Sequence, residues 1–311
     1  MIEDASFTAE KGGGRLDAAL LRRFPSSTRA FCREACAAGD VLVDGRPALK
    51  GLKLRGGEIV LVKVLPEAGD NCVRPDPSVR VNCIFSDDSI LAFDKPPGLP
   101  VQPLTRHETG TLANGVAARW PETIPLGDRP LMAGAVHRID ADTSGLVLFA
   151  RTAAAFDSLR SQFSVHTVRK TYLALVEGAV AVGGTLENDL VHDPSVPYCR
   201  MVDVRRARTS TPSPALHAVT QFAPVGRTMC GNEERTLLEV TIFTGVTHQI
   251  RAQLALAGMH IVNDRLYGAF AVENMAGHAL HALAARFSHP VSGDPVEIRT
   301  PFPPWAQMPR Q

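Results

Sequence analysis

The stretch HRIDADTSGLVLFA, residues 137–150, is the starting point for interpreting this chain. Its first nine residues are rich in polar and ionisable side chains, whereas residues 146–150 are all apolar. Enzymes commonly hold a reactive side chain on a loop that a buried element fixes in place. We therefore expect a loop that presents Asp140, followed by a buried strand.

The composition is that of a folded protein with a substantial core. The chain has 311 residues, 45% hydrophobic and 21% charged, which predicts about two domains and excludes a disordered or fibrous chain. The amino terminus lacks the pattern of a secretory signal, and no apolar run is long enough to cross a membrane. The six cysteines are scattered, which is typical of reduced thiols. We expect a cytoplasmic protein that does not contact a membrane.

Shifts in composition along the chain indicate where the domains begin and end. Residues 1–13 end in a glycine run, which predicts a flexible tail, and residues 65–80 contain three prolines without an apolar period, which predicts a linker. Between them, residues 14–64 form a small domain. The larger domain is expected at residues 81–304, followed by a short tail at residues 305–311.

The small domain has the pattern of an α/β unit. Apolar spacing predicts helices at residues 15–24 and 29–38, with Thr28 among the candidate caps of the second helix and Gly39 at its end. Short apolar runs predict strands, and Asp44-Gly45 predicts a hairpin turn between two of them.

Positive charge gathers in this small domain. Residues 14–64 contain ten Lys and Arg against five Asp and Glu, a net charge of 10 − 5 = +5, whereas the whole chain carries +1. Such a cluster is either a solvated surface or a face that contacts phosphate groups. Charge alone leaves both interpretations open.

Four short motifs in the small domain resemble the S-four-type RNA-binding domain. They are GRLD at residues 14–17, STR at 27–29, AGDVLVDG at 38–45 and GGEI at 56–59. The resemblance implies two helices and a hairpin that are presented to structured RNA. We expect Arg29 and Arg33, on the second predicted helix, to contact RNA.

The larger domain shows both strand and helix periodicity. Thr247 is expected to cap a helix that Gly258 ends, and residues 182–215 are polar and proline-bearing, which predicts an irregular loop. Strands are predicted at residues 81–85, 89–93, 146–150, 170–178, 217–224 and 236–243, and helices at 111–120, 152–163 and 248–257.

Several generic chemistries fit this domain poorly. The histidines are dispersed and do not show the spacing of a zinc site. A hydrolytic triad could be drawn from Ser144, His248 and Asp140, but its signal is weak because no Gly-x-Ser-x-Gly motif is present. Asp140 and Asp142 are too close in sequence to flank a sugar from opposite faces, as a glycosidase requires.

One carboxylate with a guanidinium to orient it remains. Asp140 beside Arg251 would stay ionised at neutral pH, because a nearby positive charge favours the carboxylate, and a planar guanidinium fixes its direction. Tyr172 offers a face on which a base can stack. This combination suits covalent chemistry on a nucleotide that has been flipped out of its stack.

Three longer motifs resemble the RluA-type pseudouridine synthases. They are HRIDADTSGL at residues 137–146, KTYLALVEG at 170–178 and TGVTHQIR at 244–251, with Asp264 and Tyr267-Gly268 following. The resemblance implies an α+β fold with a mixed, mainly antiparallel sheet and flanking helices. It also implies conversion of uridine in RNA to its carbon-linked isomer, without a metal or an organic cofactor.

The same resemblance implies roles for individual residues. Asp140 would be the catalytic nucleophile or base, and Arg251 would pair with it. Tyr172 would pack on the flipped base and assist proton removal at carbon 5. Further contacts with the RNA substrate are expected from Arg138, Lys170 and Ile250. One departure is Val246, where family members commonly carry Arg, so a positive charge near the pocket or the RNA path is lost.

The attached small domain favours large-subunit (23S) ribosomal RNA as the target. Two alternatives stay open: a synthase directed at transfer RNA, and a non-catalytic RNA-binding or ribosome-assembly factor with the same fold. We expect the protein to act as a monomer.

Overall fold

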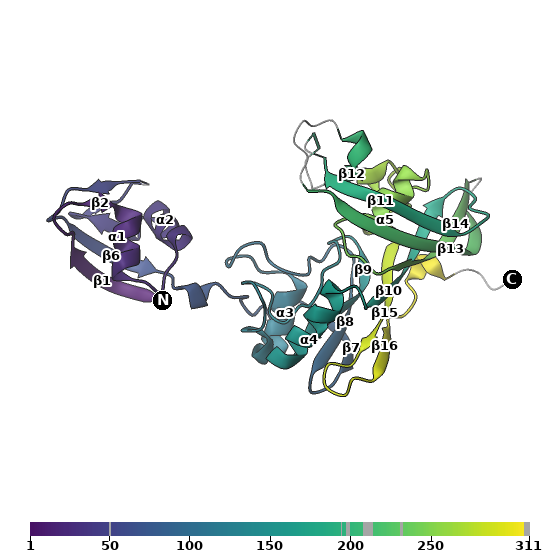
Figure 1. Ribbon diagram of the computed structural model, residues 1–311, viewed down its shortest axis with the longest axis horizontal. Coiled ribbons are helices and arrows are strands. Elements are labelled where there is room, and N and C mark those ends of the chain that lie inside the picture. Colours follow the sequence, from purple (N-terminus) through teal and green to yellow (C-terminus); the bar gives the residue numbers. More distant parts are fainter. Residues whose placement is uncertain (50, 194, 197–199, 208–213, 231–232, 308–311) are drawn as a thin grey trace. The chain divides into compact units, whose positions relative to one another are not determined.

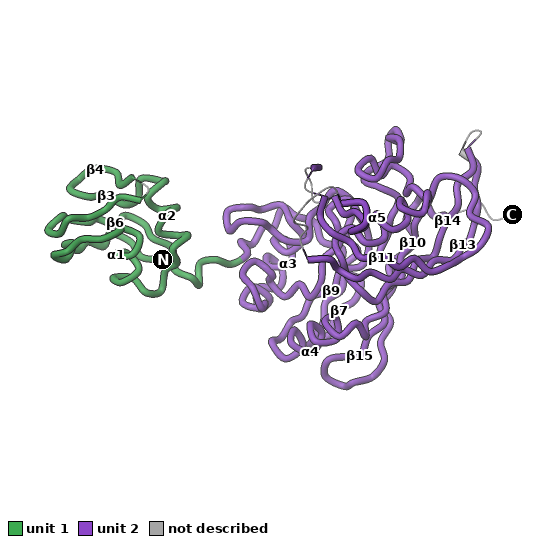
Figure 2. Tube along the Cα trace, turned by 45° about the horizontal axis from the view of Figure 1, so that its top comes forward, with its two compact units in different colours: residues 1–72 green, residues 73–311 purple. Residues whose placement is uncertain are grey.

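The computed structural model describes residues 1–49, 51–193, 195–196, 200–207, 214–230 and 233–307. The chain divides into two compact units, Met1–Cys72 and Val73–Gln311 (Figure 2). Each unit buries apolar clusters of its own. Among the described residues, no helix combines the length and the apolar character needed to cross a membrane.

In the first unit, two helices pack against a sheet whose strand order is β1-β6-β3-β4, and β2 pairs with β5 (Figure 1). The elements are β1 (Ile2–Thr8), β2 (Gly14–Arg15), α1 (Leu16–Arg23), α2 (Arg29–Ala38), β3 (Val41–Val43), β4 (Arg46–Pro47), β5 (Lys53–Leu54), β6 (Ile59–Leu65) and the 3-10 turn η1 (Ala68–Asp70).

Helix α2 confirms the prediction from its two ends. The Thr28 hydroxyl accepts a hydrogen bond from the backbone N–H of Phe31, and Gly39 ends the helix with φ at +78°. One face of the helix is buried, whereas Arg29 and Arg33, one turn apart, are exposed. The expected RNA-contacting arginines therefore share one solvent-facing side of α2.

The expected amino-terminal tail is wrong, because β1 lies within residues 1–13. This strand pairs antiparallel with β6 from Ile2↔Leu65 to Thr8↔Ile59. Its burial alternation is broken at Asp4, whose φ is +46°, and this irregularity hides the strand from a two-residue period. The expected linker is also shorter at its start, since the first unit runs to Cys72 and includes η1.

The second unit is built on a ten-stranded sheet with the order β12-β11-β13-β14-β10-β15-β9-β8-β7, and β16 pairs with β15. Pairing is antiparallel throughout the described strands, except between β9 and β15. The strands are β7 (Asn82–Ser86), β8 (Ile90–Lys95), β9 (Ser144–Ala150), β10 (Arg169–Glu177), β11 (Gly184–His192), β12 (Met201–Asp203), β13 (Leu216–Cys230), β14 (Glu233–Ile242), β15 (Leu280–Ser288) and β16 (Pro295–Arg299).

In the described part of this unit, three helices and several short turns accompany the sheet. They are α3 (Leu112–Arg119), α4 (Ala153–Ser164) and α5 (Gln249–Leu256), with the 3-10 turns η2 (Pro121–Thr123), η3 (Val204–Arg206), η4 (Arg265–Tyr267) and η5 (Pro304–Ala306). The mixed, mainly antiparallel sheet with flanking helices is the α+β architecture that the resemblance implied.

Strand β9 is buried on both faces. Val147 and Phe149 belong to the apolar cluster that includes α3, whereas Leu146 and Leu148 belong to the cluster that includes α4. Residues on a strand alternate between the two faces of the sheet, so both faces demand apolar side chains. This explains the unbroken apolar run after residue 145 and anchors the carboxyl end of the loop at residues 137–143.

Two predictions for this unit are wrong. Residues 182–215 contain β11 and β12, although residues 194, 197–199 and 208–213 lie outside the described set. The exposed face of β11 carries polar side chains, so the strand resembles a loop in sequence. The expected tail at residues 305–311 is also partly structured, since η5 extends into it and buries Ala306.

Candidate active site

A pocket of about 600 Å³ opens in the second unit. It brings together the loop at residues 137–143, strand β10 and the start of α5, which are far apart in the sequence. The predicted site residues that line it are Arg138, Asp140, Lys170, Tyr172, Ile250 and Arg251. The structure thus places all six predicted residues of the larger domain around one cavity, whereas Arg29 and Arg33 belong to the first unit.

Asp140 is tied to Arg251 by a short ion pair. The Arg251 Nη1 donates to the Asp140 Oδ2 at 2.7 Å, and the Asp140 side chain keeps 27% of its surface exposed to the pocket. The other side of the guanidinium holds Asp264 in a bidentate contact, with Nε–Oδ2 at 2.7 Å and Nη2–Oδ1 at 2.9 Å. Arg251 therefore fixes the direction of Asp140 while Asp264 fixes Arg251.

The surroundings keep Asp140 negatively charged. Burial alone raises the pKa of the Asp140 carboxyl, but His248 and the positive charge and hydrogen bond of Arg251 outweigh it, so the net pKa lies below the usual range. Asp264 holds Arg251 charged even though only 8% of the Arg251 side chain is exposed. The pocket therefore contains an ionised carboxylate at neutral pH.

His248 is the second group beside this carboxylate. Its Nε2 lies 3.7 Å from the Asp140 Oδ2, and burial lowers the pKa of the imidazole, so it is neutral at pH 7. The backbone of His248 is left-handed, with φ at +52°, and this residue takes the N-cap position of α5. The expected capping role of Thr247 is therefore wrong, because the helix begins one residue later than predicted.

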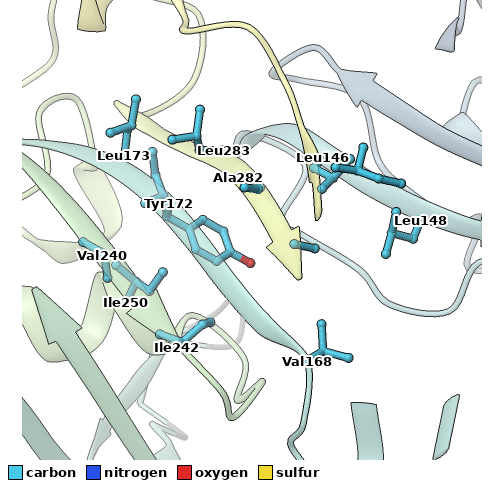
Figure 3. Close-up of a cluster of buried hydrophobic side chains, with 14 of the residues drawn as sticks. Leu146, Leu148, Val168, Tyr172, Leu173, Val240, Ile242, Ile250, Ala282 and Leu283 are labelled. Atoms are coloured by element: carbon cyan, nitrogen blue, oxygen red, sulfur yellow. The ribbon is translucent and has the colours of Figure 1, made fainter. Parts of the chain in front are cut away.

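Tyr172 comes from β10 and is 7% exposed. It shares a buried apolar cluster with Ile242 and Ile250, which lie beside it in Figure 3. Burial, with a smaller effect from the negative charge of Asp140, raises the pKa of the Tyr172 hydroxyl, so it stays protonated. Tyr172 thus presents a neutral aromatic side chain to the pocket that contains the carboxylate.

Arg138 and Lys170, two of the basic residues that line the pocket, do so in different ways. Arg138 is exposed, and within the described part of the chain its guanidinium has no hydrogen bond or ion pair. The Lys170 Nζ instead donates to the carbonyl of Thr244 at 2.6 Å and lies 5.7 Å from the Phe163 ring centroid. Burial lowers the pKa of Lys170 to about 8. Lys170 therefore also supports the loop that leads to His248.

Val246 packs where the resemblance suggests a charge. Its side chain lies against an apolar cluster that contains Leu190, Met201, Ala252 and Tyr267. The position therefore anchors the loop before α5 through apolar contact rather than through a salt bridge or a phosphate contact.

Lys95 is a site-supporting residue that sequence reasoning missed. In sequence, its place in Asp94-Lys95-Pro96-Pro97 suits either a lysine that steers phosphate or a plain surface lysine, and both interpretations are wrong because its side chain is fully buried. Its Nζ donates to the carbonyls of Ala141 at 2.7 Å and Pro96 at 2.9 Å, and burial lowers its pKa to about 7. Through its hydrogen bond to Ala141, Lys95 thus holds the backbone of the loop directly after Asp140. The signal available in sequence was its position at the end of an apolar strand.

The hydrolytic triad that the sequence allows, formed by Ser144, His248 and Asp140, is not assembled in the structure. Ser144 bonds instead to the Nδ1 of His281 at 2.8 Å, and the Nε2 of His281 lies 2.7 Å from the Thr300 hydroxyl. Because Thr300 donates onward to backbone carbonyls, it accepts from His281, and Ser144 donates to the imidazole. Ser144 is therefore part of the packing between β9 and β15.

No group of three or more His, Cys, Asp or Glu side chains in the described ranges is placed to hold a metal ion. The side chains described above give the pocket an oriented carboxylate, a neutral imidazole, and an aromatic ring with a protonated hydroxyl.

Residues 89–256 match the family described as RNA pseudouridylate synthase, and residues 14–60 match the S4 domain. The chain belongs to the RNA pseudouridylate synthase family. It is thus an RNA pseudouridine synthase, an enzyme that isomerises uridine within RNA, and its first unit contains an RNA-binding domain. Both resemblances seen in the sequence are confirmed, and the hydrolase and glycosidase alternatives are excluded.

Relatives in this family match most of the chain. The "Ribosomal large subunit pseudouridine synthase D" of Xanthomonas campestris pv. campestris is 35% identical, over 94% of this chain and 86% of that protein. A protein of the same name from Neisseria meningitidis serogroup B is 33% identical, over 94% of this chain and 77% of that protein. The structure of "Human RNA Pseudouridylate Synthase Domain Containing 1" shares the fold, with a TM-score of 0.59 and 22% identity over 74% of this chain and 87% of that one.

Proposed function

We propose that this synthase modifies uridines of large-subunit ribosomal RNA and that Asp140 is its catalytic carboxylate. The support for the target is that relatives matching nearly the whole chain are named for the large ribosomal subunit. The S4 domain, with Arg29 and Arg33 exposed on one side of α2, suits contacts with the phosphates of a folded RNA.

The observation that carries the catalytic proposal is the contact between Asp140 and Arg251 at 2.7 Å in a pocket that also contains Tyr172. A uridine flipped into this pocket meets an ionised carboxylate whose direction is already fixed. Asp140 acts at the target nucleoside, either on the base or on the sugar, so that the glycosidic bond to nitrogen breaks.

The freed uracil then turns within the pocket. A new bond forms between its carbon 5 and the ribose, the proton on carbon 5 leaves, and a proton is returned to nitrogen, so the product is an isomer of the substrate. Tyr172 stacks on the base through its ring. Because its hydroxyl is neutral in the resting enzyme, it takes part in removing the carbon 5 proton only after giving up its own proton.

Three further residues have proposed contacts with RNA. Arg138 is an exposed cation at the pocket, two residues from Asp140, so we assign it a contact with the RNA strand from which the target base is flipped. Lys170 and Ile250 line the same cavity and limit where the nucleotide sits. We further propose that the protein acts as a monomer in the cytoplasm, and the described free cysteines support a reducing location.

Pseudouridine mapping in cells tests the target. Ribosomal and transfer RNA from cells with and without the gene are compared, and the deletion strain is complemented with the intact gene. We expect the deletion to lose pseudouridine at sites in large-subunit ribosomal RNA and the intact gene to restore them. Loss confined to transfer RNA would contradict the target, and loss at no site would favour the non-catalytic factor.

The Asp140→Asn variant tests the catalytic role. It keeps the shape of the side chain and removes the charge, so we expect at least about a thousandfold loss of isomerisation with RNA binding retained. Tritium release from RNA labelled at carbon 5 of uridine measures the reaction, and a filter-binding titration measures affinity. The control is Asp142→Asn in the same loop, where the carboxyl is exposed and activity should be unchanged.

A further inference from the structure

Tyr267 ends the turn η4, three residues after Asp264, and is 5% exposed. It does not line the pocket. The Arg251 guanidinium lies over its ring, 5.2 Å from the centroid, and the His248 ring meets it edge to face at 5.8 Å with an interplanar angle of 83°. One buried ring therefore contacts both groups that lie beside Asp140.

The hydroxyl of Tyr267 lies between a donor and an acceptor. The backbone N–H of Met201 donates to the Tyr267 oxygen at 2.8 Å, and the Nδ1 of His248 lies 3.1 Å from the same oxygen. Since Met201 can only donate, the tyrosine accepts there and its own O–H is available to His248. Among the described residues, no other acceptor is placed for that proton.

This hydrogen-bond order fixes the tautomer of His248. A neutral imidazole whose Nδ1 accepts must carry its proton on Nε2, and Nε2 is the atom that faces Asp140 at 3.7 Å. The left-handed backbone of His248 is an unusual conformation for a side chain of this size. Surrounding contacts must hold such a backbone, and Tyr267 contacts the His248 side chain through both its hydroxyl and its ring.

The geometry points to Tyr267 as a positioning residue of the synthase: its hydroxyl holds neutral His248 with Nε2–H directed at Asp140, while its ring supports Arg251. This inference rests on the proposed role of Asp140. Tyr267 does not touch the substrate, and it acts on the reaction through the orientation of His248 and Arg251.

The Tyr267→Phe variant separates the hydroxyl from the ring. Phenylalanine keeps the surface against Arg251, so the fold and RNA binding should persist. We expect kcat for tritium release from large-subunit ribosomal RNA to fall roughly tenfold, with KM within about twofold of the native value. An unchanged kcat would overturn the proposal.

A double-mutant cycle tests whether Tyr267 acts through His248. His248→Ala should lower kcat, and adding Tyr267→Phe should lower it no further, because the hydroxyl then has no imidazole to hold. Losses that simply multiply would show that Tyr267 acts independently of His248 and would overturn the proposal. The control is Thr236→Val, which removes a buried hydroxyl bonded to Gly178 and Val180 and should leave kcat unchanged.

Nitrogen NMR of the full-length native enzyme gives a readout that does not depend on activity. At neutral pH we expect the His248 ring to show a protonated Nε2 and an unprotonated Nδ1, and this preference should weaken in Tyr267→Phe. The opposite tautomer in the native enzyme would overturn the inference even if Asp140→Asn is inactive. Conversely, activity that survives in Asp140→Asn would refute the proposed catalytic role while leaving the tautomer result standing.

Discussion

At the scale of single residues, Arg251 decides the electrostatics of the pocket. Its guanidinium serves two carboxylates, Asp140 at 2.7 Å and the nearly inaccessible Asp264 at 2.7 Å and 2.9 Å. Asp264 has no access to water that would replace this partner, whereas Asp140 faces the pocket. The pair between Arg251 and Asp264 is therefore structural, and the pair with Asp140 is the one that substrate can perturb.

Removing the guanidinium should leave Asp264 as an unpaired buried charge. We expect Arg251→Met to lower the free energy of unfolding by about 3–5 kcal/mol, as measured by urea denaturation, and to abolish detectable isomerisation. Adding Asp264→Asn should recover a large part of the stability but not the activity, because Asp140 still lacks its orienting partner. Equal stability of the single and double variants would contradict this account.

The residue scale also shows what sequence could predict. Asp140, Arg251 and Tyr172 were identified because ionised and aromatic side chains stand out in short motifs. The positions of Lys95 and Tyr267 in the site were not predicted, since they depend on where Ala141 and His248 come to lie in space. The sequence alone does not distinguish a buried lysine from a surface lysine.

At the scale of elements, the meeting of β9 and β15 holds the loop that carries Asp140. Ser144 and Gly145 pair in parallel with His281 and Ala282, and a Cβ on Gly145 would stand 2.2 Å from the Ala282 carbonyl oxygen. The φ of Gly145 is +106°, which side chains rarely adopt. Only glycine allows the two strands to approach this closely.

Gly145→Ala should therefore be severely destabilising. We expect a loss of more than about 2 kcal/mol in the free energy of unfolding, together with loss of activity as the loop shifts. Gly178→Ala is the matched control: its φ is +82°, but a Cβ there meets nothing within 4 Å, so about 1 kcal/mol of backbone strain is expected. Thermal or urea unfolding of the two variants gives the comparison, and equal losses would contradict a steric cause.

Buried histidines next to this junction make it sensitive to acid. Burial lowers the pKa of His278 and of His281 to about 4, below the ordinary 6.5 that they regain on unfolding. The unfolded chain therefore binds more protons between about pH 6.5 and 4, so the free energy of unfolding should fall as the pH falls through this window. His281→Asn should lower stability at pH 7 and weaken the dependence, as measured by urea denaturation across that range. A slope as steep as that of the native protein would rule His281 out as a source.

Element boundaries followed from sequence where local chemistry sets them. Thr28 caps its helix as predicted, and Thr111 and Thr152, predicted as the first residues of two further helices, cap them from one residue before the helix begins; a cap acts on residues three positions away, so its signal is local. By contrast, β1, β11 and β12 escaped prediction. Each is defined by its pairing partner, and a partner distant in sequence leaves no local signal.

At the scale of the whole molecule, the net charge of the first unit changes once its full extent, residues 1–72, is counted. Residues 1–72 contain eleven Lys and Arg against ten Asp and Glu, a net of 11 − 10 = +1, in place of the +5 of residues 14–64. Acidic residues outside 14–64 therefore offset most of the positive charge of the unit. Arg22, Arg23, Arg29 and Arg33 are all exposed on α1 and α2.

Removing the charges of Arg29 and Arg33 should weaken RNA binding without changing the rate of the catalytic step. For Arg29→Gln with Arg33→Gln we expect a higher KM, an unchanged kcat, and a salt dependence of RNA affinity that is shallower by about two charges. Lys63→Gln is the control. Lys63 is exposed on strand β6, whereas the preceding residue, Val62, is buried in the apolar cluster that includes the helices. A lower kcat in the double variant, or an equal effect of Lys63→Gln, would contradict this assignment.

The parallel pair between β9 and β15 has a consequence for the timing of synthesis. Asp140 emerges from the ribosome well before Ser144 can meet His281, which lies 137 residues further along the chain. Contacts across such a separation form late, because a long loop must close first. A growing chain that already contains Asp140 therefore lacks strand β15, which holds the loop of Asp140 through its pairing with β9. We therefore expect the enzyme to modify RNA only when its last strands have been made, although the first unit, which contains the RNA-binding domain, is complete much earlier.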